Sequence, residues 1–237
     1  MDRPYVVCHM LTSLDGKIDG AFFSAPECLP AIQKFAGVRG FYGCTATLYG
    51  TTTMLGGYAD GRTDPLPHSD TVWPHEDYIV KGDVENYIVS VDPEGVLAFD
   101  SRYLEKKNRP RALVIELLTG QVSNDYLAYL RRLQIPYLFA GEKTLDCHLA
   151  LQKLKQHFGI EKIMVSGGGL INWSFVQEDL VDELSLVIAP VADGSRSAVS
   201  IFERADFLPP RGPAAFSLKA VEQGEGGTLW LRYLAKR

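Results

Sequence analysis

The sequence lacks the features that define several classes of protein. It has no run of about 18 apolar residues, so no membrane-spanning helix is expected. Its cysteines form no C-x-x-C pair, which argues against a disulfide framework or a zinc knuckle. They are Cys8, Cys28, Cys44 and Cys147. His148 follows Cys147, but adjacent helix positions point in different directions and no second pair lies nearby, so we expect no metal site.

Basic charge is also scarce. Lysine and arginine number 24 against 29 aspartate and glutamate residues, which gives a formal charge of -5. Such a chain has no overall positive field to hold a nucleic-acid backbone, although a local basic pocket could still take a phosphorylated metabolite. Residues 1–8 lack the apolar core of a signal peptide. We therefore expect a cytoplasmic protein that binds a small molecule, with no nucleic-acid or membrane partner.

Apolar runs rich in β-branched residues alternate with segments of helical spacing. Nine runs predict strands: Tyr5–Leu11, Thr45–Tyr49, Tyr87–Val91, Ala112–Glu116, Tyr137–Ala140, Lys162–Ser166, Leu184–Ala189, Phe216–Val221 and Thr228–Leu234. Helical spacing is clearest in Leu127–Leu133 and Leu149–Phe158. Because parallel strands need crossover connections, this alternation predicts an α/β fold with a mostly parallel sheet. Only residues 222–227 join the last two runs, which predicts a C-terminal antiparallel hairpin and a mixed sheet.

Nothing in the sequence divides the chain. Its 237 residues, 46% of them hydrophobic, can bury one sizeable core, and no linker rich in proline, glycine or serine separates two halves. We predict a single domain over residues 1–237. Prolines and glycines gather between Tyr58 and Glu76 and predict a long loop, which either roofs a site or is a surface insertion.

The strongest signal for chemistry is the run Gly167, Gly168 and Gly169, which follows a predicted strand and leads into a helix with Leu170 and Ile171. Glycines let a ligand approach the backbone, and the N–H groups and dipole of a helix N-terminus attract an anion. A phosphate therefore fits there. A tight turn or close helix packing also explains the glycines, and the spacing is not the G-x-G-x-x-G of a Rossmann fold.

Two further polar segments stand at predicted strand ends, where ligands collect in open α/β sheets. Ser13, Asp15 and Lys17 place a hydroxyl, a carboxylate and an ammonium group where burial could perturb their pKa values. A polar turn at the same residues is the alternative. Residues 50–53 offer hydroxyl and N–H groups to a cofactor, or an ordinary threonine N-cap.

In order along the chain, these segments resemble the reductase domain of bacterial riboflavin biosynthesis, the C-terminal half of the bifunctional deaminase-reductase. Ser13–Ile18 is similar to its S-L-D-G-K-I motif, and Gly50–Thr53 to its G-x-x-T. Gly167–Gly169, Leu180–Leu184 and Ala189–Val191 resemble its glycine turn, L-V-D-E-L and a-P-v runs. The resemblance spans about residues 4–235. It implies a dihydrofolate-reductase-like, three-layer α/β/α fold with a sheet of about nine strands, NADPH as hydride donor, and a homodimer.

The resemblance also implies roles by matched position. The cofactor would contact Gly167, Gly168, Gly169, Leu170, Ile171, Gly50 and Thr53, with Ser90 near the adenosine 2′-phosphate. The substrate would contact Ser13, Ser166 and Arg39, and Asp15 and Lys17 are the catalytic candidates. Arg39 suits a phosphate because its planar fork binds one bidentately, or it is a surface arginine that packs along Phe35 and Phe41.

The chain departs from these relatives at two positions. They often have glutamate before the glycines, where this chain has Ser166, and aspartate where it has Gly57. Both changes remove a carboxylate from the expected substrate side and leave the cofactor side unchanged. No arginine follows the strand that ends at Val91, and Asp92 stands there instead, so the choice of NADPH over NADH comes from the resemblance.

These features together indicate an NADPH-dependent reductase that resembles 5-amino-6-(5-phosphoribosylamino)uracil reductase and transfers hydride to an imine or ring-opened ribosyl carbon. Asp15 is the proton donor or organiser if burial raises its pKa, and Lys17 could stabilise negative charge on the substrate. The alternatives are a reductase of another pteridine-like or carbonyl substrate, an NADPH-binding module without catalysis, and an interaction scaffold whose glycines serve only packing.

Overall fold

The structure is a computed structural model that describes residues 2–63, 65–107 and 109–236. The chain divides into two compact units, each built from two stretches of sequence. The first unit comprises residues 1–4 and 45–161, and the second comprises residues 5–44 and 162–237. Whether they act as the single domain expected over residues 1–237 stays a prediction. Within the described residues, no helix is long and apolar enough to cross a membrane.

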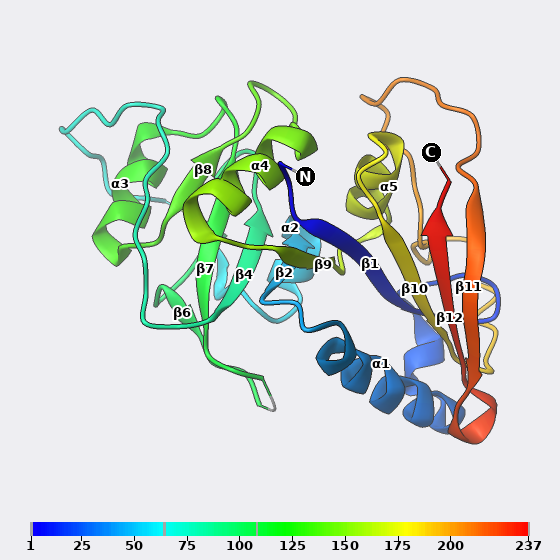
Figure 1. Ribbon diagram of the computed structural model, residues 1–237. Coiled ribbons are helices and arrows are strands. Elements are labelled where there is room, and N and C mark those ends of the chain that lie inside the picture. The colour runs from blue at the N-terminus through cyan, green and yellow to red at the C-terminus, as the bar shows by residue number, and fades with distance from the viewer. Residues whose placement is uncertain (1, 64, 108, 237) are drawn as a thin grey trace. The chain divides into compact units, whose positions relative to one another are not determined.

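The first unit is built around a mostly parallel sheet (Figure 1). Strands β2 (Ala46–Gly50), β4 (Asn86–Val91), β7 (Ala112–Leu118) and β8 (Tyr137–Phe139) pair in this order, all parallel. The short strand β6 (Tyr103–Leu104) pairs antiparallel with the start of β7. A separate two-stranded pair joins β3 (Gly61–Arg62) to β5 (Leu97–Ala98). The helix α2 (Thr51–Leu55) directly follows β2.

Helices α3 (Asn124–Leu133) and α4 (Cys147–Phe158) cover the two faces of this sheet (Figure 1). Leu127 of α3 belongs to a buried cluster with Ile88 of β4. Phe158 of α4 instead meets the ring of Tyr87, at 5.7 Å between centroids. Because successive strand residues point to opposite faces, α3 and α4 lie on opposite sides, and the unit is an α/β/α sandwich.

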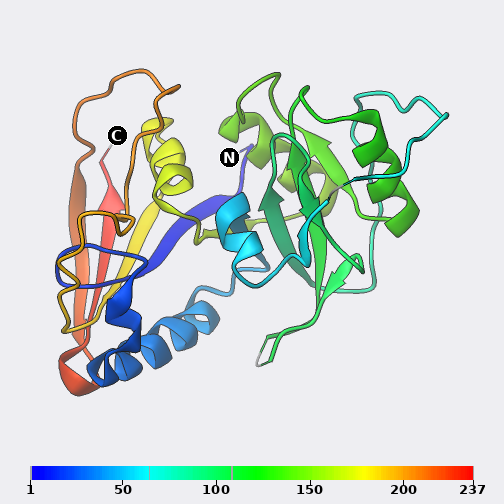
Figure 2. The ribbon, with the colours of Figure 1, turned by 180° about the vertical axis from the view of Figure 1, so that it is seen from behind.

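In the second unit, five strands pair in the order β11, β12, β10, β1, β9, with parallel and antiparallel neighbours. Strands β1 (Tyr5–Thr12), β9 (Lys162–Val165) and β10 (Glu183–Ile188) are parallel. The hairpin of β11 (Phe216–Gln223) and β12 (Leu229–Ala235) adds the antiparallel strands, and Figures 1 and 2 both show it beside β10. Helix α1 (Leu29–Tyr42) packs on one face of the sheet, and α5 (Gly169–Gln177) connects β9 to β10.

The α/β class, the mixed and mostly parallel pairing and the C-terminal hairpin are confirmed. Each of the nine predicted runs overlaps a strand, and the ends of that strand differ from the predicted ends by at most two residues. The prediction missed β3, β5 and β6, each of two residues, because such short strands carry no readable alternation.

The loop expected between Tyr58 and Glu76 is present, apart from residue 64, which lies outside the described residues, and its only strand residues are those of β3. It is fastened to the start of α3. The Ser69 amide donates to Asp125 Oδ1 and the Trp73 amide to Asn124 Oδ1, both at 2.8 Å. Two backbone amides of the loop therefore find their hydrogen-bond acceptors on side chains of α3, in the same unit.

A carboxyl group lies inside the core of the first unit. Glu116 of β7 is fully buried and pairs in register with Ser90 of β4 and Tyr137 of β8. Burial raises the pKa of Glu116 well above its ordinary value, and the nearby Asp92 carboxylate raises that pKa further. Asp92 is itself fixed, because it accepts the amides of Val96 and Leu97. Burial therefore favours the neutral form of Glu116 in the folded chain.

We expect Glu116→Gln to make stability less dependent on pH. A carboxyl group with a raised pKa contributes its full stability below its unfolded pKa, near 4.5, and loses it as pH rises toward the folded value. Between about pH 5 and 7, the free energy of unfolding of the unmodified chain should fall relative to the variant by up to about 1.4 kcal/mol per pH unit. Urea unfolding across this range measures the difference, and parallel pH profiles would contradict it.

Candidate functional site

Three loops follow the carboxyl ends of the parallel strands in the second unit. The Asp15 loop (residues 13–18) follows β1, the glycine turn (residues 166–169) follows β9, and a strap (residues 190–203) follows β10. Since β1 pairs in parallel with both β9 and β10, the three loops leave the same edge of the sheet. This is the edge where open α/β sheets bind ligands.

The three glycines of the turn serve different purposes. A Cβ on Gly167 would lie 2.8 Å from Ile171 Cβ, and one on Gly169 would lie 2.4 Å from the Ser200 carbonyl oxygen. Both glycines are therefore required by close packing. A Cβ on Gly168 would meet no atom within 4 Å of the described structure, so open space faces this residue. Close packing and ligand access, the two explanations of the run, thus apply to different glycines.

Gly168 is the N-cap of α5, so the turn also supplies hydrogen-bond donors. The Asn172 amide donates to the Gly168 carbonyl oxygen at 3.1 Å and closes the first helical turn. The amides of Gly169, Leu170 and Ile171 come before that bond and have no acceptor within the helix. The first turn carries no acidic residue. This helix end can therefore hold a phosphate group.

Asp15 is an anchor for the strap. Its Oδ1 accepts the Ser13 hydroxyl at 2.6 Å and the Asp193 amide at 2.9 Å, while its Oδ2 accepts the Gly194 amide at 2.9 Å. The Ser13 hydroxyl, followed by the two amides, lowers the pKa of Asp15 far below its ordinary value. The condition for Asp15 to act as the proton donor, a pKa raised by burial, is not met, because the side chain is exposed and the hydrogen bonds favour the carboxylate.

Lys17 fastens the same two segments together. Its Nζ lies 3.0 Å from the Ala198 carbonyl oxygen and 3.4 Å from Ser200 Oγ. Its backbone amide donates to Ser13 Oγ at 2.9 Å. Ser13 is buried, and its hydroxyl also donates to Asp15, so this hydroxyl is engaged within the loop. The Asp15 loop is therefore a closed hydrogen-bonded unit.

The strap was missed in the sequence, and it joins the Asp15 loop to the glycine turn. The Ile201 amide donates to the Gly16 carbonyl oxygen, and the Glu203 amide donates to that of Gly169, both at 3.1 Å. The Ser200 amide donates to Glu203 Oε1 at 2.8 Å. The available signal was Asp193-Gly194, a turn dipeptide soon after a strand, within a stretch without helical or strand periodicity.

Ser166 and Arg39 are also in the second unit. Ser166 is buried, and its hydroxyl donates to the His9 carbonyl oxygen at 2.9 Å. Arg39 lies in the last turn of α1 with its guanidinium carbon 5.3 Å from the centre of the Phe35 ring. Phe41 instead lies under Arg232, at 4.9 Å. Of the two expected packing partners, Arg39 therefore contacts Phe35.

Three predicted cofactor residues lie in the first unit. Gly50 is the N-cap of α2, so the expected threonine N-cap is wrong; the Thr51 hydroxyl donates to the Val91 carbonyl oxygen at 2.8 Å instead. Thr53 is partly exposed within α2. Ser90 is fully buried in β4 beside Glu116, which shields its hydroxyl from any ligand. The remaining predicted site residues all belong to the second unit.

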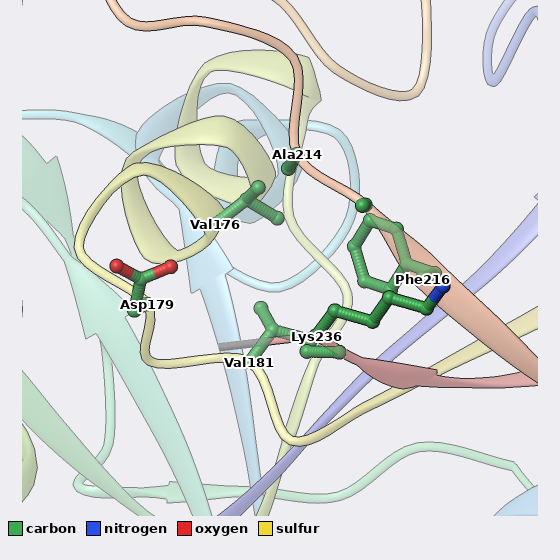
Figure 3. A pocket seen from close by; sticks show the side chains of 8 residues that line it. Val176, Asp179, Val181, Ala214, Phe216 and Lys236 are labelled. Atoms are coloured by element: carbon green, nitrogen blue, oxygen red, sulfur yellow. The ribbon is translucent and has the colours of Figure 1, made fainter.

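A small hollow lies elsewhere in the second unit, between the end of α5 and the C-terminal hairpin (Figure 3). It is lined by Val176, Asp179, Val181, Phe216 and Lys236, among others. Its volume is about 10 Å³, which is room for about one water molecule. This hollow is therefore too small for a substrate or cofactor.

An open helix end beside a polar loop, both at the carboxyl edge of parallel strands, is an arrangement that α/β proteins use to bind phosphorylated ligands. The RibD C-terminal domain matches this chain over residues 4–229, and the chain belongs to that family. The resemblance drawn from the motifs is thereby confirmed.

Two curated relatives carry the name 2,5-diamino-6-ribosylamino-4(3H)-pyrimidinone 5′-phosphate reductase. The protein of Methanothermobacter thermautotrophicus is 26% identical over 211 residues, covering 85% of this chain and 84% of its own. The protein of Aquifex aeolicus is 26% identical over 201 residues, covering 85% and 83%.

Solved structures show the same fold. A pyrimidine reductase-like protein from Corynebacterium diphtheriae has a TM-score of 0.68 at 17% identity, covering 99% of this chain and 92% of its own. RibD from Acinetobacter baumannii has a TM-score of 0.63 at 21% identity. This chain is covered completely in that match but spans only 59% of the RibD chain.

The packing roles of the glycines predict unequal effects on stability. Gly169→Ala should lower the free energy of unfolding by about 1–3 kcal/mol, because its Cβ would overlap the Ser200 carbonyl of the strap. Gly168→Ala should cost no more than about 1 kcal/mol, since only the N-cap preference changes. Urea unfolding of both variants measures the difference, and equal stabilities would rule out the assigned packing.

Proposed function

We propose that this protein is an NADPH-dependent reductase of the riboflavin pathway that acts on a ribosylamino-pyrimidine 5′-phosphate. The observation that carries the proposal is the open helix end at Gly168, tied through the strap to the Asp15 loop. Family membership and the reductases named among the relatives support the reaction class. A cytoplasmic location, as expected from the sequence, fits a supply of NADPH.

The glycine turn fits the cofactor, because space and donors for a phosphate meet at Gly168. NADPH supplies the hydride when bound. The amides of Gly169, Leu170 and Ile171 hold one of its phosphate groups, and the absence of a side chain at Gly168 lets that group approach the backbone. Contacts of Gly50 and Thr53 with the cofactor stay predictions from the resemblance.

On the substrate side, Asp15 is an organiser. Its carboxylate stays ionised at neutral pH, so Asp15 is not the donor of the proton that accompanies the hydride. Asp15 instead fixes the strap, which in turn holds Lys17 Nζ near Ser200 Oγ. The Lys17 ammonium can stabilise negative charge that develops on the substrate. Arg39 binds the substrate phosphate through its planar fork.

Ser166 favours a second candidate, a reductase of the same cofactor with another pteridine-like or carbonyl substrate. Relatives often have a carboxylate at this position, whereas the Ser166 hydroxyl donates to the His9 carbonyl oxygen and offers only a neutral acceptor in place of a charged one. Assays of NADPH oxidation with both pyrimidine phosphates, dihydrofolate and simple carbonyl compounds separate the candidates. Tight cofactor binding without oxidation of NADPH by any compound would indicate a binding module.

We expect Gly168→Ala to weaken NADPH binding by about tenfold, because its Cβ stands where a phosphate oxygen approaches the helix end. Gly37→Ala is the matched control: its added Cβ also meets no atom within 4 Å, and it lies in the middle of α1. Fluorescence titration with NADPH and NADH gives the dissociation constants. Unchanged NADPH affinity in Gly168→Ala would overturn the assignment, and equal affinity for the two cofactors would refute the preference for NADPH.

The homodimer implied by the resemblance has a suitable surface in the C-terminal hairpin. Strand β11 is the outermost strand of its sheet, and Leu218 and Val221 on it are 57% and 56% exposed. We expect a dimer in analytical ultracentrifugation and a monomer after Leu218→Glu combined with Val221→Glu, because buried charges oppose association. A dimer that survives both changes would exclude this hairpin as the interface.

A further inference from the structure

A histidine inside the second unit is held in one chemical form. His9 of β1 is fully buried, with Nε2 at 3.0 Å from the Phe35 carbonyl oxygen and Nδ1 at 3.0 Å from Ser185 Oγ. A carbonyl oxygen only accepts, so Nε2 carries the hydrogen and Nδ1 accepts from the serine hydroxyl. Trp230 Nε1 donates to the same Ser185 Oγ at 2.8 Å. Burial lowers the pKa of His9 to about 4, so the ring is neutral.

The His9 ring fixes an aromatic side chain of α1. The rings of His9 and Phe35 are stacked, with centroids 4.4 Å apart and planes 13° apart. The Arg39 guanidinium carbon lies 5.3 Å from the Phe35 centroid. Phe35 and Arg39 are four residues apart on the helix, so they share one face. The position of Arg39 therefore depends on a ring that the sheet itself holds in place.

His9 also touches the glycine turn through its backbone. Its carbonyl oxygen accepts the hydroxyl of Ser166, the residue that precedes Gly167. One residue of β1 thus joins two side chains expected on the substrate side: Ser166 through its backbone, and Arg39 through the ring of Phe35.

We infer that Phe35, held by neutral His9, is a positioning residue that orients the Arg39 guanidinium for the 5′-phosphate of the substrate. The Arg39 guanidinium carbon lies over the face of the Phe35 ring, and the attraction between this face and the cation restrains where the N–H groups of Arg39 lie. It also reduces the side-chain entropy that Arg39 loses when a phosphate binds. The inference rests on the proposed function only in taking Arg39 as the phosphate ligand.

The test measures binding of ribose 5-phosphate by calorimetry, with ribose as the uncharged comparison. Phe35→Leu keeps an apolar side chain but removes the ring, and we expect it to weaken ribose 5-phosphate binding about fivefold. Phe35→Tyr should retain the affinity, because the ring remains. Phe41→Leu is the matched control: it lies on the same helix, but its ring is under Arg232. Binding of ribose should be equally weak in all variants.

A double-mutant cycle separates positioning from general stability. In an Arg39→Met background, Phe35→Leu should cause no further loss, because the group that it orients is gone. An equal loss in both backgrounds would overturn the inference, as would unchanged affinity in Phe35→Leu or no measurable binding by the unmodified protein. Should Phe35→Leu not fold, Arg39→Lys tests the inference instead. It keeps the positive charge and loses the planar guanidinium group, so undiminished affinity for ribose 5-phosphate would overturn the inference.

This experiment needs neither NADPH nor turnover, so its failure is distinct from failure of the proposed function. Oxidation of NADPH by Phe35→Leu with a pyrimidine phosphate, at the same rate and KM as in the unmodified protein, would support the reductase function and exclude the positioning role of Phe35. An increased KM at unchanged kcat is the expected kinetic result, since orientation of Arg39 acts on phosphate binding.

Discussion

The second unit depends on the position of β1 between two parallel partners. Its residues pair with Lys162–Val165 of β9 on one side and with Glu183–Ile188 of β10 on the other. Parallel pairing brings three carboxyl ends to one edge, although about 150 residues of sequence separate the Asp15 loop from the glycine turn and the strap. The Asp15 loop, the glycine turn and the strap can bond to one another only because this pairing places them there. Hydrogen bonds then fix this arrangement. Asp15 and Lys17 bond to the strap on one side, and on the other side the Gly169 carbonyl oxygen accepts a strap amide.

The two carboxyl groups that stand out in the structure have opposite electrostatic surroundings. Asp15 is exposed and accepts three hydrogen bonds, so its charged form is favoured and its pKa falls. Glu116 is enclosed in the core near the charge of Asp92, so its neutral form is favoured and its pKa rises. The motif at the end of β1 suggested that burial could raise the pKa of Asp15. In the structure, burial raises the pKa of Glu116 instead, in the core of the other unit. An acidic side chain at a strand end therefore does not by itself identify a proton donor.

Much of the fold could be predicted from the sequence because most of the strands are long and apolar. Runs such as Ala112–Glu116 carry enough β-branched residues to be recognised, whereas β6, with two residues, carries no pattern. The site was readable only in part. The motif around Asp15 and the glycines marked the carboxyl edge of the second unit. Apart from its first two residues, which belong to the Ala189–Val191 run, the strap has no motif, since its role comes mainly from backbone amides that any sequence provides. The contact of Ser90 with the cofactor came from the resemblance and stays a prediction; in the structure, strand parity directs its hydroxyl into the core beside Glu116.

The side chain at position 166 links the fold to the choice of substrate. Serine can donate its hydrogen to the His9 carbonyl oxygen, so it folds inward and leaves no charge at the strand end. An ionised glutamate, which related reductases often have there, cannot donate this hydrogen bond. Under the proposed function, loss of that carboxylate would leave Arg39 and Lys17 as the charged groups for recognising the substrate. Recognition through the phosphate would then matter more than recognition of the ring, and so would the contact of Arg39 with the Phe35 ring that His9 holds.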